Sequence, residues 1–351
     1  MDVRLSLVPL DTDHLADQVN HIVDATQSLW FWSRPQWRDY ELARNPKLED
    51  HSWALVDKEY RVHAAQLLTY NPDDLEYGLG DLPAPPPAIL PPDGDDSHYD
   101  FDYEQCRAGL IARCEKSGSL RLKSAIWHPH FKSEFTDQEM VMAGQDRKAL
   151  ICAWGYAHTC ASPLMGQWVD VGHKTRIINL QKEQDQLWHD MRKSYRHLIR
   201  DSKLNIGTET HSEARKICQD LHQRAAGGKT RPTDSWIYQD AWAQQNQASW
   251  FIARDPDTTQ PVGFAYVIRD KRYAYYASAA SLTPNVSHAI QWAVIKHLKG
   301  LGVTYYEMGH QGVGVTKKES NIEFFRRGFG GEDFVQPIYT CDVRPVDRVV
   351  H

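Results

Sequence analysis

The order of elements after residue 233 constrains the fold of this chain more than any other feature. The sequence predicts a helix over 233–247 and three strands over 249–254, 262–269 and 272–279. Asp270-Lys271 is a short link that favours a tight hairpin between the last two strands. A helix over 287–299, a strand over 303–308, a short helix over 321–327 and a strand over 334–342 complete the series. A meander that leads into a helix and then a parallel strand predicts a mixed sheet with helices on its faces.

Two segments carry the clearest helical periodicity. Over 287–299, Gly300 and Gly302 favour the end of a helix whose buried stripe is predicted to contain Ile290, Val294, Leu298 and Leu301. Over 184–203, apolar residues also fall on one face at helical spacing, and these are Leu187, Met191, Tyr195 and Leu198. We therefore expect one continuous helix over 184–203, and another over 212–224.

The first half of the chain has a looser version of the same order. Helices are expected over 12–29, 35–44 and 102–117, and strands over 52–56, 62–70, 119–127, 149–156 and 175–180. A segment rich in proline and aspartate over 81–102 predicts an extended loop inserted in this half. The simplest architecture is two similar α/β (α+β) units, over 1–180 and 181–351.

The composition disfavours several classes of protein. A formal net charge of -6 is unlike that of a globally basic protein that binds DNA. No run approaches the roughly 20 apolar residues of a membrane-spanning helix, and the start of the chain lacks a signal layout, so we expect a cytoplasmic protein without a transmembrane segment. The six cysteines form no C-x-x-C pair and the short run His128-Pro129-His130 stands apart from them, so we expect no metal site.

Three runs in the second half carry a resemblance to a known family. They are LWHDMRKSYRHLIR over 187–200, YYASA over 275–279 with KGLGVTYYEMG over 299–309, and IEFFRRGFGG over 322–331. In this succession they resemble the FemAB-type transferases, a branch of the acetyltransferase-like (GNAT) superfamily. The resemblance covers about half of the chain. It implies two tandem acetyltransferase-like folds with mixed, mostly antiparallel sheets flanked by helices.

The resemblance also implies a reaction, in which an amine attacks an activated acyl or aminoacyl group without a covalent enzyme intermediate. Better-known members use aminoacyl-tRNA and build peptidoglycan cross-bridges, whereas many bacterial relatives act on sugars, peptides or polysaccharide precursors. The implied acceptor is therefore a sugar- or peptide-type amine on a small molecule or a cell-envelope precursor. The implied co-substrate is acyl-CoA or aminoacyl-tRNA, with no tightly bound cofactor. No long heptad pair interrupts the second half, so the helical arm of some tRNA-dependent members is missing and tRNA stays an open partner.

Two other functions fit the same sequence. One is an acyl-CoA-dependent N-acetyltransferase. The other is a catalytically silent module in which the paired folds bind a glycan or a peptide.

Glu307, His310 and Arg326 are the candidate catalytic residues. Arg326 replaces a family lysine and keeps its positive charge, but it cannot deprotonate, so we expect it to stabilise charge rather than to act as a base. Glu307 and His310 lie at or just past a predicted strand end, and the ordinary pKa of histidine suits a base. The alternative is that Glu307 is a structural ion-pair partner and His310 a loop residue.

Arg192, Arg196 and Arg200 are candidates for binding an anion. Their spacing places them on one ridge of the predicted helix, where a diphosphate, CoA or tRNA phosphates would pair with them. The alternative is a solvated face balanced by Asp190 and Asp201.

Several other residues are candidates for binding substrate. Gln311 begins a run that resembles the acyl-CoA pyrophosphate loop, although Thr316 ends it and a surface loop is the alternative. Arg231 belongs to a basic loop over 227–231 that suits an acidic substrate, and Trp236, one of twelve tryptophans, is expected to line the cleft or the core. Tyr276 and Ser278 share a strand face, from which they either bind substrate or enter the core.

Overall fold

The computed structural model describes residues 5–26, 31–80, 84–85, 88–89, 121–125, 169–170, 173–311, 316–336 and 338–342. The chain divides into two compact units, Met1–Gly172 with Gln336–His351, and His173–Val335. They differ from the predicted halves in two places, because the strand before residue 180 joins the second unit and the end of the chain groups with the first. The expected helix over 102–117, the expected strand over 149–156 and most of the 81–102 segment lie outside the described residues.

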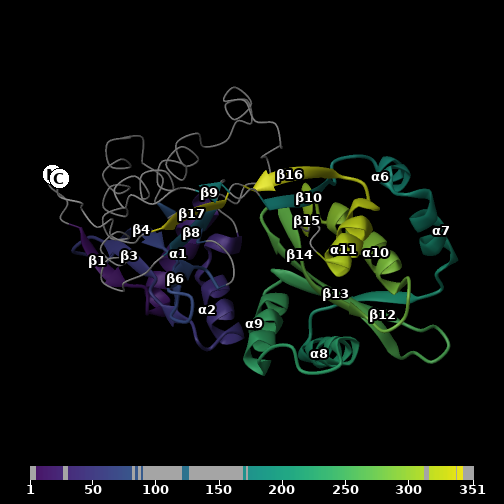
Figure 1. Ribbon diagram of the computed structural model, residues 1–351, viewed down its shortest axis with the longest axis horizontal. Helices are drawn as coiled ribbons and strands as arrows, with labels where there is room; N and C mark the ends of the chain where they lie inside the picture. The colour runs from purple at the N-terminus through teal and green to yellow at the C-terminus, as the bar shows by residue number, and fades with distance from the viewer. Residues whose placement is uncertain are drawn as a thin grey trace. The chain divides into compact units, whose positions relative to one another are not determined.

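The second unit is built on a seven-stranded sheet of order β11-β12-β13-β14-β15-β10-β16 (Figure 1). The strands are β10 (His173–Asn179), β11 (Asn205–Glu209), β12 (Ala248–Arg254), β13 (Pro261–Asp270), β14 (Tyr273–Ser281), β15 (Tyr305–Gln311) and β16 (Glu332–Gln336). β14 and β15 pair in parallel, whereas β11, β12, β13 and β14 form an antiparallel series. The mixed sheet predicted from the element order is confirmed, as is its mostly antiparallel character, which the resemblance implies.

Helices cover both faces of this sheet. On one face α8 (Ser212–Ala226) packs on β13 and β14, and α9 (Thr233–Gln244) packs on β12. The opposite face holds α10 (Val286–Gly300), with α6 (Gln184–Asp190), α7 (Lys193–Asp201) and α11 (Lys317–Arg327) beside it (Figure 1). The expected hairpin is present, since Asp270 pairs with Tyr273 and Lys271 takes the positive φ of 52° that a tight turn requires.

Each face has its own core. Ile290, Val294 and Leu298 of the α10 stripe are buried against the sheet, as their spacing predicts. Leu301, expected on the same stripe, instead caps the end of α10 and is 50% exposed. The α8–α9 face instead buries large aromatic rings, including Trp236 and Trp250. Removal of this apolar surface from water is the main force that holds the helices on the sheet.

The helix predicted over 184–203 is wrong, because the structure has two helices there. Met191 and Arg192 interrupt it with extended ψ values of 150° and 140°. The Arg192 backbone N–H donates to the Gly328 carbonyl at 2.9 Å instead of bonding within a helix, while the Met191 side chain is buried. A contact with a distant segment therefore overrides a continuous apolar stripe.

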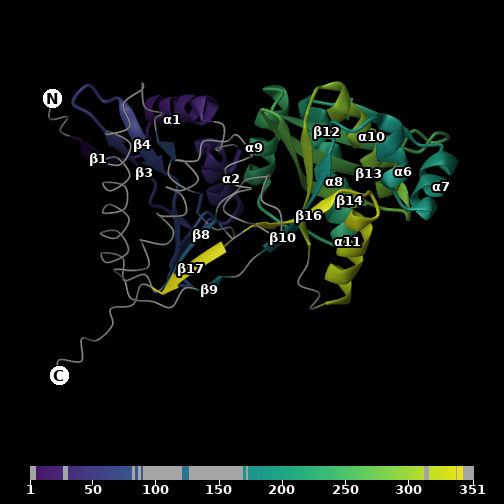
Figure 2. The ribbon, with the colours of Figure 1, turned by 90° about the horizontal axis from the view of Figure 1, so that it is seen from above.

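The last predicted strand is also divided. β16 closes the sheet of the second unit, and β17 (Ile338–Asp342) pairs with β8 and β9 of the first unit (Figure 2). The strand β11 was not expected from the sequence.

The first unit contains a four-stranded sheet of order β1-β3-β4-β7 and a six-stranded sheet of order β2-β5-β6-β8-β17-β9. Its elements are β1 (Ser6–Pro9), α1 (Asp13–Ala25), the 3-10 helix η1 (Phe31–Ser33), α2 (Pro35–Arg44), β2 (Glu49–Asp50), β3 (Trp53–Val56), β4 (Val62–Gln66), β5 (Thr69–Asn71), β6 (Glu76–Gly78), β7 (Ala88–Ile89), β8 (Arg121–Ala125) and β9 (Val169–Asp170). β7 lies inside the segment expected to be a loop and pairs with β4.

Within the described ranges, no helix has the length and apolar character to cross a membrane. The same ranges contain no cluster of three or more His, Cys, Asp or Glu side chains that is able to hold a metal ion.

Candidate active site

A gap between β14 and β15 forms the centre of the candidate site. The two strands pair only from Tyr273 to Tyr275 within the described residues, opposite Tyr305 to Glu307. Past this point, the register of β14 against β13 shifts between the partners Tyr276 and Ser278, so Ala277 is an extra residue. Such a bulge bends a strand and increases its twist. β14 therefore diverges from β15 and leaves an opening in the sheet.

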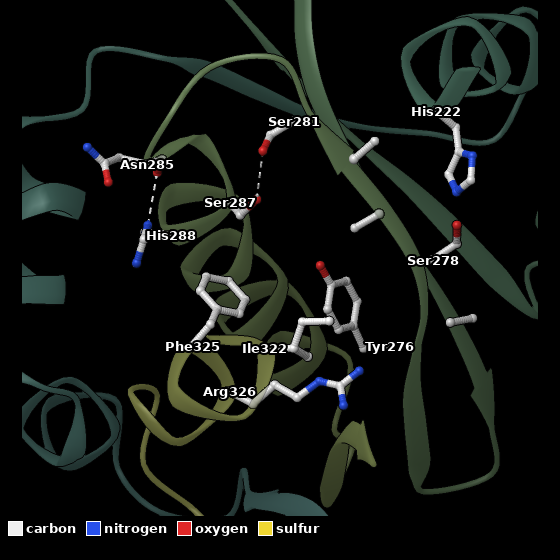
Figure 3. Close-up of a pocket in the computed structure, with 13 residues that line it drawn as sticks. His222, Tyr276, Ser278, Ser281, Asn285, Ser287, His288, Ile322, Phe325 and Arg326 are labelled. Atoms are coloured by element: carbon white, nitrogen blue, oxygen red, sulfur yellow. Dashed lines mark hydrogen bonds between the residues drawn. The ribbon is translucent and has the colours of Figure 1, made fainter. Parts of the chain in front are cut away.

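The opening holds a pocket of about 550 Å³ (Figure 3). Its wall is formed by β14 residues 276–281, by side chains at the start of α10 and on α11, and by His222 of α8. α8 lies on one face of the sheet, and α10 and α11 lie on the other. The pocket is therefore lined from both faces, and its volume suits a small molecule or one end of a larger one.

The start of α10 provides an electropositive wall. Asn285, the N-cap residue, has a left-handed φ of 69° and makes no side-chain capping bond within the described part of the chain. Ser287 in the first turn donates to the Ser281 hydroxyl at 3.3 Å. The first N–H groups of a helix have no helical partner and carry the positive end of the helix dipole, so this wall favours an anionic group.

Arg326 brings a positive charge to the same side of the pocket. It lies in the last turn of α11, and its guanidinium rests against Gly309 of β15, where a Cβ atom would lie 3.0 Å from Nη2. Gly309 also has a φ of 88°, which other residues rarely adopt. A side chain at position 309 would push Arg326 out of place.

Tyr276 lies beside Arg326 in the pocket (Figure 3). Burial raises the pKa of Tyr276 to about 12, against smaller opposing effects of a hydrogen bond with Gln291 and of the Arg326 charge. Its hydroxyl is therefore protonated at neutral pH and available as a donor. The neighbouring Tyr306 hydroxyl donates to Gln291 Oε1 at 2.7 Å, which fixes this amide behind the pocket.

Glu307 lies at the point where the strands separate. Its carboxylate is buried, with 5% of the residue exposed, and accepts a hydrogen bond of 2.6 Å from the Thr175 hydroxyl. The residues that line the pocket in the described part of the chain do not include Glu307. His310 and Gln311 continue β15, where they pair with Thr175 and Lys174, but their side chains lie outside what the structure describes, as do residues 312–315.

The three arginines predicted to form one ridge do not do so. Arg192 lies outside α7, where its Nη1 donates to the Phe324 carbonyl at 2.8 Å and its Cζ lies 3.7 Å from the centre of the Phe324 ring. Arg196 pairs with His189 Nδ1 at 2.9 Å, and Arg200 is exposed at the end of α7. The described residues around the pocket include none of these arginines.

Arg231 and Trp236 form a stacked pair next to the pocket. The Arg231 Cζ lies 3.7 Å from the centre of the Trp236 ring, and its Nη2 donates to Gln239 Oε1 at 2.7 Å. Trp236 is only 1% exposed and packs edge-on against His222, with ring centroids 5.5 Å apart. Trp236 thus supports a pocket residue from the core.

The structure brings together Tyr276, Ser278 and Arg326 among the predicted site residues. The prediction that Tyr276 and Ser278 share one face of the strand is wrong, because the extra residue Ala277 reverses the alternation between them. Sequence reasoning missed His222 and the start of α10. The proline before Asn285 marks a helix start, but no local signal in the sequence indicates which side chain of α8 reaches the opening.

The fold is similar to solved structures of known type, although no protein-family model and no curated protein sequence matches the chain. The crystal structure of FemX matches with a TM-score of 0.64 at 10% identity, over 95% of this chain and 96% of that one. A tandem GNAT protein from the clavulanic acid biosynthesis pathway has a TM-score of 0.53 at 13% identity, over 98% and 100%. The C-terminal domain of a putative lysylphosphatidylglycerol synthetase from Agrobacterium fabrum has a TM-score of 0.51 at 10% identity, over 93% and 90%. The chain therefore has the tandem acetyltransferase-like, FemAB-like fold that its motifs predict.

Proposed function

We propose that this protein is a transferase that joins an acyl or aminoacyl group to an amine on a sugar- or peptide-type acceptor. The observation that carries this proposal is the pocket at the divergence of β14 and β15, which is lined from both faces of the sheet. A transfer reaction needs two substrates to meet at one carbon atom. The two sides of this pocket have different side chains, so donor and acceptor are able to bind at the same time.

The groups on the α10–α11 side suit the donor. Acyl-CoA and aminoacyl-tRNA both carry phosphates, and the first turn of α10 presents the positive end of the helix dipole to an anion. Attack on the acyl carbon creates a negative oxygen, which a positioned cation stabilises. We assign this role to Arg326. An arginine side chain carries a positive charge that is able to stabilise this oxygen, but it does not act as a base.

The helix start also favours one donor over the other. The small side chains of Ser281, at the end of β14, and Ser287 line the pocket there, with Asn285 at the N-cap. A diphosphate at the end of a slender thioester arm matches such a wall. We therefore propose acyl-CoA as the first choice of donor. If the acyl group is acetyl, the protein is an acyl-CoA-dependent N-acetyltransferase, which is the second candidate function. Aminoacyl-tRNA is the alternative donor.

Donor binding and donor consumption test this proposal separately. We expect acetyl-CoA to raise the melting temperature of the full chain, because a ligand that binds only the folded state stabilises it by mass action. Mass spectrometry of incubations with amino sugars and lysine-containing peptides would then identify an acylated product. Stabilisation by charged tRNA alone would reverse the choice of donor. Binding of acceptors without consumption of either donor would support the silent binding module and reject the transferase.

A further inference from the structure

His222 reaches the pocket from the side opposite Arg326. It lies near the end of α8, and Figure 3 shows its imidazole pointing toward the Ser278 hydroxyl. The start of α10 and the α11 residues lie across the opening (Figure 3). An acceptor that enters from the α8 side would therefore meet His222 before it meets the donor.

Two contacts fix the orientation of the imidazole. Its Nδ1 lies 2.9 Å from the Thr230 hydroxyl, which belongs to the loop between α8 and α9. Its ring stands edge-on to Trp236 at an interplanar angle of 75°, and Trp236 is buried. With Nδ1 engaged at the loop, Nε2 is the ring nitrogen that remains for the pocket. A tautomer with the proton on Nδ1 donates to Thr230 Oγ1 and presents the lone pair of Nε2.

The surroundings of His222 favour its neutral form over the charged imidazolium. Burial, and after it the positive charge of Arg231, lower the pKa of His222 below the ordinary value for histidine. The other elements packed against the ring present Trp236 from α9, Phe264 from β13 and Ser278 from β14, none of which titrates near neutral pH. The same Arg231 charge disfavours an ammonium group nearby, so an acceptor amine would also lie there in its neutral, nucleophilic form.

We propose that His222, positioned by Thr230, is the base that removes the proton from the acceptor amine during acyl transfer. The amine lone pair forms the C–N bond, and the bond from the acyl carbon to the sulfur or oxygen of the donor breaks with its electron pair. The nitrogen proton passes to Nε2, and the resulting imidazolium returns it to the leaving thiolate or alkoxide. Thr230 Oγ1 accepts from Nδ1–H throughout and stabilises the charged ring.

A second histidine in the pocket serves as the comparison. His288 lies in the first turn of α10, where the helix dipole opposes a positive charge. Its Nδ1 lies 3.3 Å from the Asn285 carbonyl, and its ring packs edge-on against Tyr195 and Phe325. It belongs to the donor side of the opening, and we assign it no proton transfer.

The proposal rests on the proposed function, so its test has one readout that depends on turnover and one that does not. Without substrate, NMR of 15N-labelled histidine in the full chain reports the tautomer and pKa of His222, assigned by comparison with His222→Gln. We expect a neutral ring at pH 7 with the proton on Nδ1, and Thr230→Val to shift the tautomer balance. A ring that is protonated at pH 7, or that carries its neutral-form proton on Nε2, overturns the proposal even if the protein is an active transferase.

The second readout is the pH profile with acetyl-CoA and whichever amine the wild-type chain acetylates. His222→Gln should lower kcat about 10²- to 10⁴-fold, as loss of a general base does, and abolish the acid limb of the profile. Thr230→Val should lower kcat by about tenfold with little change in KM, since one orienting hydrogen bond is lost. His288→Gln should keep the acid limb, whatever its effect on KM. An unchanged acid limb in His222→Gln overturns the proposal, whereas a wild-type chain that consumes no donor removes the proposed function and this inference with it.

Discussion

The two faces of the sheet around β14 differ in what they offer to a ligand. On the α10–α11 face, the helix start and Arg326 bring positive potential to the opening. On the α8–α9 face, burial lowers the pKa of His222, and a hydroxyl and a buried ring hold its imidazole. One strand, β14, contributes Tyr276 to the first face and Ser278 to the second. In the proposed reaction, one bulged strand therefore separates the group that would stabilise charge from the group that would accept a proton.

Loss of the buried aromatic ring of Trp236 on the α8–α9 face should have the largest effect on the stability of the protein. Trp236→Ala removes a side chain that is 1% exposed, and we expect it to lower the free energy of unfolding by ~3–5 kcal/mol. Ile237 follows on the same helix but is 52% exposed, so Ile237→Ala is the control and should change stability little. Urea titration of both variants compares them. Equal losses would mean that Trp236 does not anchor this face.

On the other face, Arg326 should have the largest effect on chemistry. Arg326→Ala is expected to lower kcat about 10²- to 10³-fold, because a positioned donor to the developing oxyanion is lost. The matched control is Arg327→Ala, whose guanidinium pairs with Glu323 at 2.8 Å and with Asp333 at 3.1 Å. Steady-state kinetics with acetyl-CoA distinguish the two. If Arg326→Ala raises KM for acetyl-CoA but leaves kcat unchanged, Arg326 binds the donor and does not stabilise the transition state.

A carboxylate introduced at the start of α10 should increase the stability of the fold but weaken donor binding. In Ser287→Asp, the negative charge interacts favourably with the helix dipole and stabilises the fold by ~0.3–1 kcal/mol. The same charge repels a phosphate, so we expect KM for acetyl-CoA to rise about tenfold. Ser287→Asn provides a neutral control of the same size. If KM stays constant in Ser287→Asp, the phosphates do not bind at the start of α10. That result would favour the run beginning at Gln311, whose sequence resembles a pyrophosphate loop.

Arg231 should give the smallest effect, as a shift in pH dependence. Burial is the first cause of the lowered pKa of His222 and Arg231 the second, so Arg231→Gln should raise this pKa while leaving the larger effect of burial in place. A higher pKa means that His222 is protonated at a higher pH, and the acid limb moves in that direction. Arg224→Gln, at an exposed position already paired with Asp220 at 3.2 Å, is the control. A shift to lower pH would contradict the assigned electrostatics.

Local sequence patterns predicted most of the helices and strands of the second unit, but only some of the residues of its candidate site. The hairpin at Asp270-Lys271 and the stripe of α10 depend on neighbouring residues, and both are present in the structure. The roles of Glu307 and His310 stay predictions. His222 was missed because its place in the pocket depends on the bulge at Ala277, which appears only when β13 pairs with β14. The break at Met191 was missed for the same kind of reason, since the Gly328 carbonyl that stabilises it lies far along the chain.

The return of β17 to the first unit has a consequence for how the protein is made. β17 lies between β8 and β9 in the six-stranded sheet, so this sheet is complete only when residues 338–342 have left the ribosome. The strands of the second unit are all synthesised before that moment. The sheet of the first unit therefore depends on a strand from far along the sequence, and until β17 pairs, the backbone groups that β8 and β9 present to it are able to pair with another chain.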